Sequence, residues 1–431
     1  MRVSTSFLSS TSVGAMTEQQ SKLNKTQLKV SLGQRLLSPS EDPYASSRAL
    51  RFEESLAVFT QFGVNASYAD NRLATQEGVL EGVNDALQRV RELTINANSD
   101  SQTNESRRFI AEEIKQIYLQ VLDLANSKDA TNEYLFSGFQ GKTRPFVPDS
   151  VTGQVLYKGD DGQRFLKIGP STSVPVSDAG EAVFYHVRNG NGTFTTGDFA
   201  TNTGTGIIDP GSVGSNYVPE DYTIKFTGPT VPPNNPDDPV EYYVYDRNDI
   251  IVAPPASAGL ARAVYEVTDL LTFGGVQYQE DALISGLDAN GAFVSISGEP
   301  APGDMYEVKR SNYQDMFTTL DNLVNALETN LNTDADRTQF HNAMNRVVSD
   351  LDQALGNILD SRARVGARLN TTGKQMEINE SFTLQMEKTL SEIKDLDYAE
   401  AVTDLNLQLA GLQAAQQAYV KVQGLSLFNY L

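Results

Sequence analysis

The two ends of the chain each carry a long run in which apolar or Gln residues recur at alternating steps of three and four, the spacing of one helix face. In the first run Gln occupies every second of these positions, and a buried amide without a hydrogen-bond partner costs about 1–3 kcal/mol. We therefore expect each terminal helix to become ordered against another helix, from the opposite end of the chain or from a neighbouring copy. The predicted assembly interface consists of Val13, Met16, Gln20, Leu23, Gln27, Val30, Gln34, Leu37, Val402, Leu405, Leu409, Leu412, Gln416 and Tyr419.

A proline break separates the N-terminal run from the residues that follow. Pro39 and Pro43 each remove a backbone donor and push the preceding residue out of the helical region. We expect a helix over about residues 4–37, an inter-domain break at Pro39, Asp42 and Pro43, and a second helix after the break. At the other end of the chain, the three-four spacing of the apolar residues, which we call the seam, changes phase after Leu396. The last helix is therefore expected to face a new direction or follow a bend.

Between these ends the chain alternates between helical and β character. Helical periodicity runs through residues 59–97, 110–124, 317–331 and 340–386, and a polar turn at 98–104 predicts a helical hairpin. Gly, Pro, Asn, Thr and Tyr become frequent between about 144 and 311. Strands are predicted at 155–157, 164–168, 183–187, 222–226, 242–245, 293–296 and 306–308, with mobile loops at 197–214 and 228–239.

This order predicts an α+β fold in which both chain ends form a long antiparallel helical bundle or coiled coil and a β-rich domain is inserted between them. The expected divisions are an N-terminal helix (1–43), the first part of a helical rod (44–143), the β-rich insert (144–311), the second part of the rod (312–395) and a C-terminal helix (396–431).

Charge and composition exclude several functional classes. The net charge of −21 disfavours nucleic acid and anionic membranes as partners, and no apolar run reaches the ~20 residues needed to span a bilayer. The start of the sequence lacks the apolar stretch of a cleaved signal peptide.

Residues 1–45 hold five basic and three acidic side chains, a balance of +2, whereas residues 396–431 hold one basic and three acidic side chains, a balance of −2. Such mildly complementary ends can pack densely together.

Residues that carry chemistry are scarce. The absence of Cys excludes disulfides and thiolate chemistry. The two histidines, His186 and His341, lie far apart in the sequence without metal-ligand spacing around either. The sequence therefore predicts no catalytic, cofactor-binding or metal site, and a protein that is not an enzyme.

Several motifs at the helical ends resemble the flagellin superfamily, and more specifically its hook-associated protein 3 branch, which joins hook and filament in bacterial flagella. The Pro-Ser-acid-Asp-Pro break is typical of this branch, and Glu41 stands where the family commonly has Asp. The residues that carry the resemblance are Met1-Arg2-Val3-Ser4-Thr5, Gly33-Gln34-Arg35, Pro39-Ser40-Glu41-Asp42-Pro43, Arg48-Ala49-Leu50, Arg91-Glu92-Leu93, Leu124-Ala125-Asn126, Tyr134-Leu135-Phe136-Ser137-Gly138, Tyr157-Lys158-Gly159-Asp160, Pro302-Gly303-Asp304 and Leu425-Ser426-Leu427-Phe428-Asn429-Tyr430-Leu431.

The resemblance implies a structural subunit that forms a homo-oligomeric ring between hook-associated protein 1 on the hook side and flagellin on the filament side. It also implies an export chaperone, secretion through the flagellar type III apparatus without a cleaved signal, and an extracellular location in the flagellum. The terminal helices would form an inner tube and the β-rich insert would lie outward. Two alternatives stay open: a self-polymerising flagellin, and a glycan-binding or adhesive module in residues 144–311, suggested by its many tyrosines.

Overall fold

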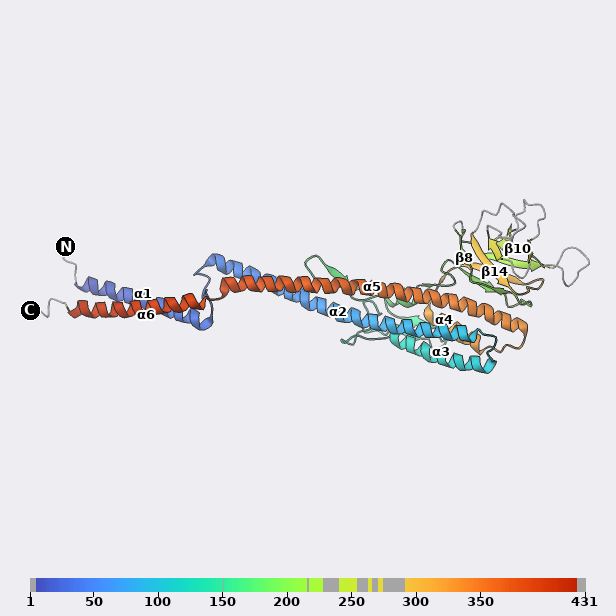
Figure 1. The fold of residues 1–431 in the computed structure, drawn as a ribbon, viewed down its shortest axis with the longest axis horizontal. Helices are drawn as coiled ribbons and strands as arrows, with labels where there is room; N and C mark the ends of the chain where they lie inside the picture. The colour runs from blue at the N-terminus through green and yellow to red at the C-terminus, as the bar shows by residue number, and fades with distance from the viewer. Residues whose placement is uncertain are drawn as a thin grey trace, which may run out of the picture. The chain divides into compact units, whose positions relative to one another are not determined.

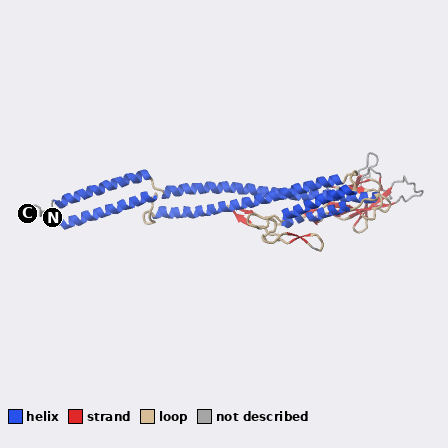
Figure 2. Ribbon diagram, turned by 90° about the horizontal axis from the view of Figure 1, so that it is seen from below, coloured by secondary structure: helices blue, strands red, loops and turns tan. Residues whose placement is uncertain are grey.

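The computed structural model describes residues 5–149, 151–214, 217–227, 240–253, 263–265, 270–273 and 291–424. The predicted fold class, α+β with long helices at both ends and an inserted β-rich region, is confirmed (Figures 1 and 2). No helix in these ranges is long and apolar enough to cross a membrane. The chain divides into a terminal unit, residues 1–67, 167–172 and 373–431, and a central unit, residues 68–166 and 173–372.

In the described ranges, six α-helices carry the framework: α1 Thr5–Leu32, α2 Pro43–Ala97, α3 Asn104–Ala125, α4 Met316–Glu328, α5 Asp334–Lys394 and α6 Tyr398–Gly424. The predicted first helix was too long, because Gly33 adopts a left-handed φ of +67° and ends α1 at Leu32. The second helix begins at Pro43 as expected, and the break after Lys394 falls where the seam changes phase.

Within the central unit, α2, α3, α4 and α5 lie side by side (Figure 1). The seam predicted on the second helix is fully buried from Ala66 onward, including Leu73, Leu80 and Leu87. Ion pairs at the rim join neighbouring helices, such as Arg91 on α2 with Asp352 on α5 at 2.5 Å. Such exposed pairs contribute little, so the apolar seam supplies most of the stability.

The insert is built from short antiparallel strands. Their bounds are β1 Phe146–Pro148, β2 Val155–Tyr157, β3 Phe165–Lys167, β4 Ser173–Pro175, β5 Val187–Arg188, β6 Phe194–Asp198, β7 Ile207–Ile208, β8 Ser212–Val213, β9 Tyr222–Thr227, β10 Val240–Asp246, β11 Ile251–Ala253, β12 Ala263–Tyr265, β13 Leu270–Phe273, β14 Ala292–Ser297, β15 Met305–Arg310 and β16 Tyr313–Gln314. The main sheet has the order β11-β10-β9-β15-β6, and a smaller sheet has the order β13-β14-β7. A common core of alternate strand residues, among them Phe194, Ile224, Val294 and Tyr306, joins the two sheets.

Two predictions about the insert were wrong. Residues 183–187 were expected to be a strand, but Glu181–Tyr185 form a π-helical turn. Val183 and Phe184 are both fully buried, which an alternating strand cannot achieve, and Asn357 of α5 donates to the Val183 carbonyl at 2.7 Å. Part of 197–214 was expected to be a mobile loop but forms β7 and β8; 228–239 lies outside the described residues.

A stripe of polar residues on α5 holds the insert to the helices of the central unit. Asn342 accepts from the Ile208 amide at 2.8 Å, and Asp350 accepts from the Gly190 amide at 2.6 Å. Asn342 and Asp350 lie eight residues apart, about two helical turns, and so share one face of α5. Each satisfies a backbone group of the insert that would otherwise be buried without a partner. Burial raises the pKa of Asp350.

A buried ion pair lies further along the same helix. Arg368 binds the Asp178 carboxylate with two nitrogens at 2.8 and 2.9 Å, while Gln76 and Gln163 donate to it at 2.7 and 2.8 Å. Burial by itself would raise the pKa of Asp178, but these donors outweigh it and hold the pKa below its usual value. The carboxylate therefore fastens residues around 178 to both α2 and α5.

We predict that Asp178→Asn destabilises the central unit by about 3–5 kcal/mol at pH 7, because it leaves Arg368 buried without its counter-charge. Since the pKa of Asp178 is depressed in the folded state, its contribution is present above the ordinary carboxyl pKa and is lost as the pH falls through the folded-state value. Urea unfolding followed by far-UV circular dichroism at several pH values should show the two proteins converging below about pH 4.

Asp161→Asn is the matched control, because Asp161 is exposed in a loop and should leave the unfolding midpoint unchanged. Equal midpoints for Asp178→Asn and the unaltered protein at pH 7 would contradict the role assigned to the ion pair.

Candidate assembly surface

The two breaks in the helical framework are fastened to each other in the terminal unit. The amide of Arg35 donates to the Lys394 carbonyl at 2.8 Å, and the amide of Leu396 donates to the Gly33 carbonyl at 3.0 Å. Gln34 and Asp395 form an antiparallel bridge between them. The point where α1 ends is thus fixed against the point where α6 begins.

The proline break has a defined role at this junction. Pro43 starts α2, where its missing amide hydrogen has no cost, and Asp42 accepts from the Ala45 amide at 2.9 Å as the helix cap. Pro39 lies in the turn closed by the hydrogen bond from the Glu41 amide to the Ser38 carbonyl. A small apolar cluster accompanies this junction. Ala45, Ala49 and Ile393 are buried together, and Leu36, Phe52 and Leu390 pack against them.

Charged side chains close the rim of the junction. Lys394 pairs with Glu53 at 2.5 Å and Lys29 with Glu41 at 3.0 Å. The hydrogen bond from Lys29 lowers the pKa of Glu41. These partly exposed pairs mainly orient the break, because solvent screens them.

Helices α1 and α6 lie side by side and antiparallel beyond the junction (Figures 1 and 2). Their least exposed positions follow a three-four alternation, Met16, Gln19, Leu23, Thr26 and Val30 on α1 and Ala401, Leu405, Gln408, Leu412, Ala415 and Tyr419 on α6. The seam includes a polar layer in which Thr26 donates to the Gln408 side chain at 3.0 Å. Gln19 also donates to the Gln408 carbonyl at 3.5 Å.

The structure divides the residues of the predicted interface into two groups. Buried or half-buried against the rest of the terminal unit are Met16, Leu23, Val30, Leu37, Leu405, Leu409, Leu412 and Tyr419. Exposed are Val13, Gln20, Gln27, Gln34, Val402 and Gln416. The predicted and the observed patterns on α1 both alternate steps of three and four, and two such patterns share every seventh residue. Met16, Leu23 and Val30 therefore belong to both. Sequence reasoning missed Gln19, Thr26 and Gln408, and a second pattern one residue away was the signal that could have identified them.

Large apolar side chains remain exposed on the paired helices. Leu28 and Leu32 of α1 are 49% and 56% exposed, and Leu407 of α6 is 66% exposed. Others lie on the terminal part of α2 and α5, such as Leu50 and Leu384. A pair of helices that leaves such a surface uncovered has the character of a protein–protein interface.

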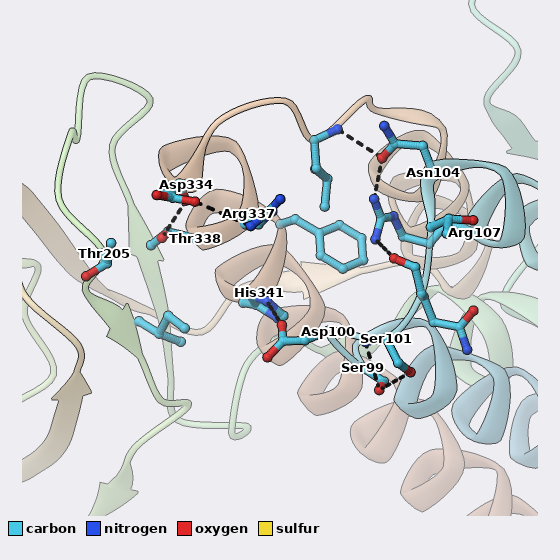
Figure 3. Close-up of a pocket in the computed structure, with 15 residues that line it drawn as sticks. Ser99, Asp100, Ser101, Asn104, Arg107, Thr205, Asp334, Arg337, Thr338 and His341 are labelled. Atoms are coloured by element: carbon cyan, nitrogen blue, oxygen red, sulfur yellow. Dashed lines mark hydrogen bonds and ion pairs between the residues drawn. The ribbon is translucent and has the colours of Figure 1, made fainter.

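A cavity of about 710 Å³ lies in the central unit between the turn that joins α2 and α3 and the start of α5 (Figure 3). Arg107, buried at the start of α3, donates to the Gln102 carbonyl at 2.9 Å and to the Asn104 side chain, and its guanidinium lies 5.1 Å from the Phe340 ring. Burial lowers the pKa of Arg107. The residue holds the turn between α2 and α3 rather than pointing at a ligand.

His341 lines the same cavity and is engaged in the same way. Its ring nitrogens lie 2.8 Å from the Asn98 side chain and 3.1 Å from the Asp100 carboxylate (Figure 3). Among the described residues, no group of three or more His, Cys, Asp or Glu side chains could hold a metal ion. His341 thus joins α5 to the turn between α2 and α3.

Comparisons with known proteins agree with this geometry. Residues 3–141 match the family model for the bacterial flagellin N-terminal helical region. Flagellar hook-associated protein 3 of Escherichia coli K12 is 21% identical over 430 residues, covering 100% of this chain and 99% of that protein. The crystal structure of the flagellar junction protein FlgL from Legionella pneumophila is 28% identical with a TM-score of 0.69, and the match covers 81% of this chain and 100% of that chain.

The flagellin of Escherichia coli K12 is 27% identical over 330 residues, which cover 72% of this chain and 64% of that protein. Residues 3–141 therefore match the flagellin N-terminal helical region. The full-length homologues are hook-associated protein 3, the hook-filament junction protein, and flagellin is the more distant match.

We predict that Gly33→Ala weakens the junction. A left-handed residue with a side chain costs about 1–2 kcal/mol, and the added Cβ would lie 2.9 Å from the Tyr398 hydroxyl oxygen. Amide hydrogen exchange of residues in α1 and α6 should become faster. The second change Tyr398→Phe should recover the steric part of the loss but not the backbone part.

Gly14→Ala provides the control, because its Cβ would meet nothing within 4 Å and alanine stabilises a helix interior by about 0.5–1 kcal/mol. Slower exchange is expected for that variant. If both variants changed exchange equally and in the same direction, the role of Gly33 in ending the helix would be refuted.

Proposed function

We propose that this chain is a non-enzymatic structural subunit of the bacterial flagellum that forms the ring joining hook-associated protein 1 at the hook end to the flagellin filament. The observation that carries the proposal is the terminal unit, in which α1 and α6 are paired but leave apolar residues such as Leu28 and Leu407 exposed. Neighbouring copies can cover these residues by coiled-coil packing, as the full-length similarity to hook-associated protein 3 leads us to expect.

The remaining predictions follow from the same role. The assembly interface would include the exposed residues of the predicted set, and the divisions 1–43 and 396–431 would form an inner tube with 144–311 facing outward. The four partners would be sister copies, hook-associated protein 1, flagellin and an export chaperone. The protein would be extracellular after type III secretion, a route that the absence of Cys suits.

The principal alternative is a self-polymerising flagellin. It is supported by the 27% identity to Escherichia coli flagellin, although that match covers only 64% of the flagellin. A junction ring ends after a limited number of copies, whereas a flagellin would grow long filaments by itself when seeded. Electron microscopy of the purified protein with hook fragments as seeds therefore separates the two.

The adhesive alternative loses much of its basis. Tyr222, Tyr242 and Tyr306 lie in the core of the insert, where the rings of Tyr242 and Tyr306 pack against Phe226. Tyr243 and Tyr245 remain half-buried on β10 with their ring centroids 6.5 Å apart. Such residues are ordinary strand formers.

We predict that deleting residues 1–40 or 396–431 abolishes assembly while the central unit stays folded. Each deletion removes one of the two helices of the terminal pair but leaves the core of the insert intact. In cells lacking the native protein, the deleted forms should give hooks without filaments and flagellin in the medium.

Circular dichroism and limited proteolysis of the deleted forms provide the control, since both should report a folded central unit. Filaments of normal number on cells that contain a deleted form would refute the proposed role of the termini.

A further inference from the structure

The outward faces of the two terminal helices carry opposite charge beside exposed leucines. On α1 the face comprises Lys25, Leu28 and Leu32, which we call the basic face. On α6 it comprises Glu400, Asp404 and Leu407, which we call the acidic face. All six residues are exposed, and their spacing of three and four places each set on one side of its helix.

These charges are not used to hold α1 and α6 together. Among the described residues, no ion pair joins the two helices. Lys22 pairs with Glu18 on its own helix and Lys29 pairs with Glu41 at the break. The positive charge of Lys25 contributes to lowering the pKa of Glu41. In the described part of the chain, however, Lys25 forms no ion pair within 4 Å.

The acidic face shows the same pattern. Within the described residues Glu400 accepts no hydrogen bond at its carboxylate, and neither it nor Asp404 forms an ion pair. The opposite charges of the two ends therefore remain on the outer surface of the helix pair rather than across its seam.

The two faces lie at matching heights along the helix pair. The hydrogen bond between Thr26 and Gln408 fixes the relative position of α1 and α6, and both faces lie in the halves of these helices nearest the break at Gly33 and Asp395. A second copy at the same height can therefore place its acidic face level with the basic face of the first.

We propose that the basic face of one copy docks on the acidic face of the next copy, which makes the contact between neighbours head-to-tail. This inference rests on the proposed function and specifies the contact through which the ring closes. Because the two faces belong to different helices, the contact leaves one unused face at each end of a row, so copies can be added until a ring closes. The leucines supply buried apolar area, while the charges select partner and register.

Charge exchange between two variants tests the proposal. Lys25→Glu makes both faces acidic, and the double change Glu400→Gln with Asp404→Lys makes both faces basic. Each variant alone should yield roughly tenfold fewer filaments per cell in a strain lacking the native protein, because like charges then meet at every contact. Producing the two variants together should restore filaments, since each face again meets its opposite in the other variant.

Two controls carry charge changes of the same sign elsewhere. Lys142→Glu and Asp161→Lys lie at exposed loop positions of the central unit and should leave filament number unchanged. Lys25→Glu, Glu400→Gln and Asp404→Lys combined in one chain should also restore filaments. If the combined chain assembles but the mixture does not, the charges act within one chain and the proposal is overturned. Normal filament numbers for either variant alone would also overturn it.

The absence of Cys permits a direct test of proximity. A Leu28→Cys copy and a Leu407→Cys copy, with different tags, should be joined by a short bis-maleimide in assembled flagella. Phe109→Cys with Leu407→Cys is the control, because Phe109 is at least as exposed as Leu28 but lies on α3 in the central unit. Dimers of two Leu28→Cys copies alone, no mixed dimer, or equal joining in the control would each overturn the head-to-tail contact.

These outcomes are distinct from failure of the proposed function. If chains lacking residues 1–40 still assemble, the role of the termini itself is wrong. If those chains fail to assemble but the charge variants behave like the unaltered protein, the termini assemble through other residues and only the present inference fails.

Discussion

The terminal unit depends on the hydrogen bonds that join the two breaks in the chain. Arg35 donates its amide to the Lys394 carbonyl and its side chain to the Ile393 carbonyl, and the Leu396 amide donates to the Gly33 carbonyl. These bonds between residues far apart in sequence fix the end of α1 against the start of α6. The seams of α1 and α6 are partly polar, and in proteins most of a helix's stability comes from packing of its apolar face, so the pairing that this contact sets is what orders them. The junction therefore sets the register in which Thr26 meets Gln408.

A different principle holds the insert in the central unit. The apolar face of α5 packs within the helical bundle, while a polar stripe on the same helix binds main-chain groups of the insert through Asn342, Asp350 and Asn357. Buried polar groups of this kind are costly unless every partner is supplied, which makes the docking specific. One helix thus organises two layers of different chemistry.

The charge pattern connects both units to the proposed assembly. Apart from its mildly opposed ends, the acidic chain concentrates its charge on residues outside the terminal helices, so the helix pair is close to neutral and can be packed at high density. The small residual charges on α1 and α6 lie on outer faces rather than in the seam. They are therefore placed to select between neighbouring copies, which is where electrostatic complementarity acts most effectively.

The sequence by itself determined the helices, the breaks and most of the strands, because periodicity, proline positions and turn residues act over a few neighbouring residues. The limits of α1 and the π-helical turn at 181–185 escaped it, since Gly33 and Phe184 adopt conformations set by distant partners. Likewise, two overlapping three-four patterns on α1 were equally compatible with the sequence. Only the tertiary structure decided which faced α6, because that choice depends on the junction between residues some 360 positions apart.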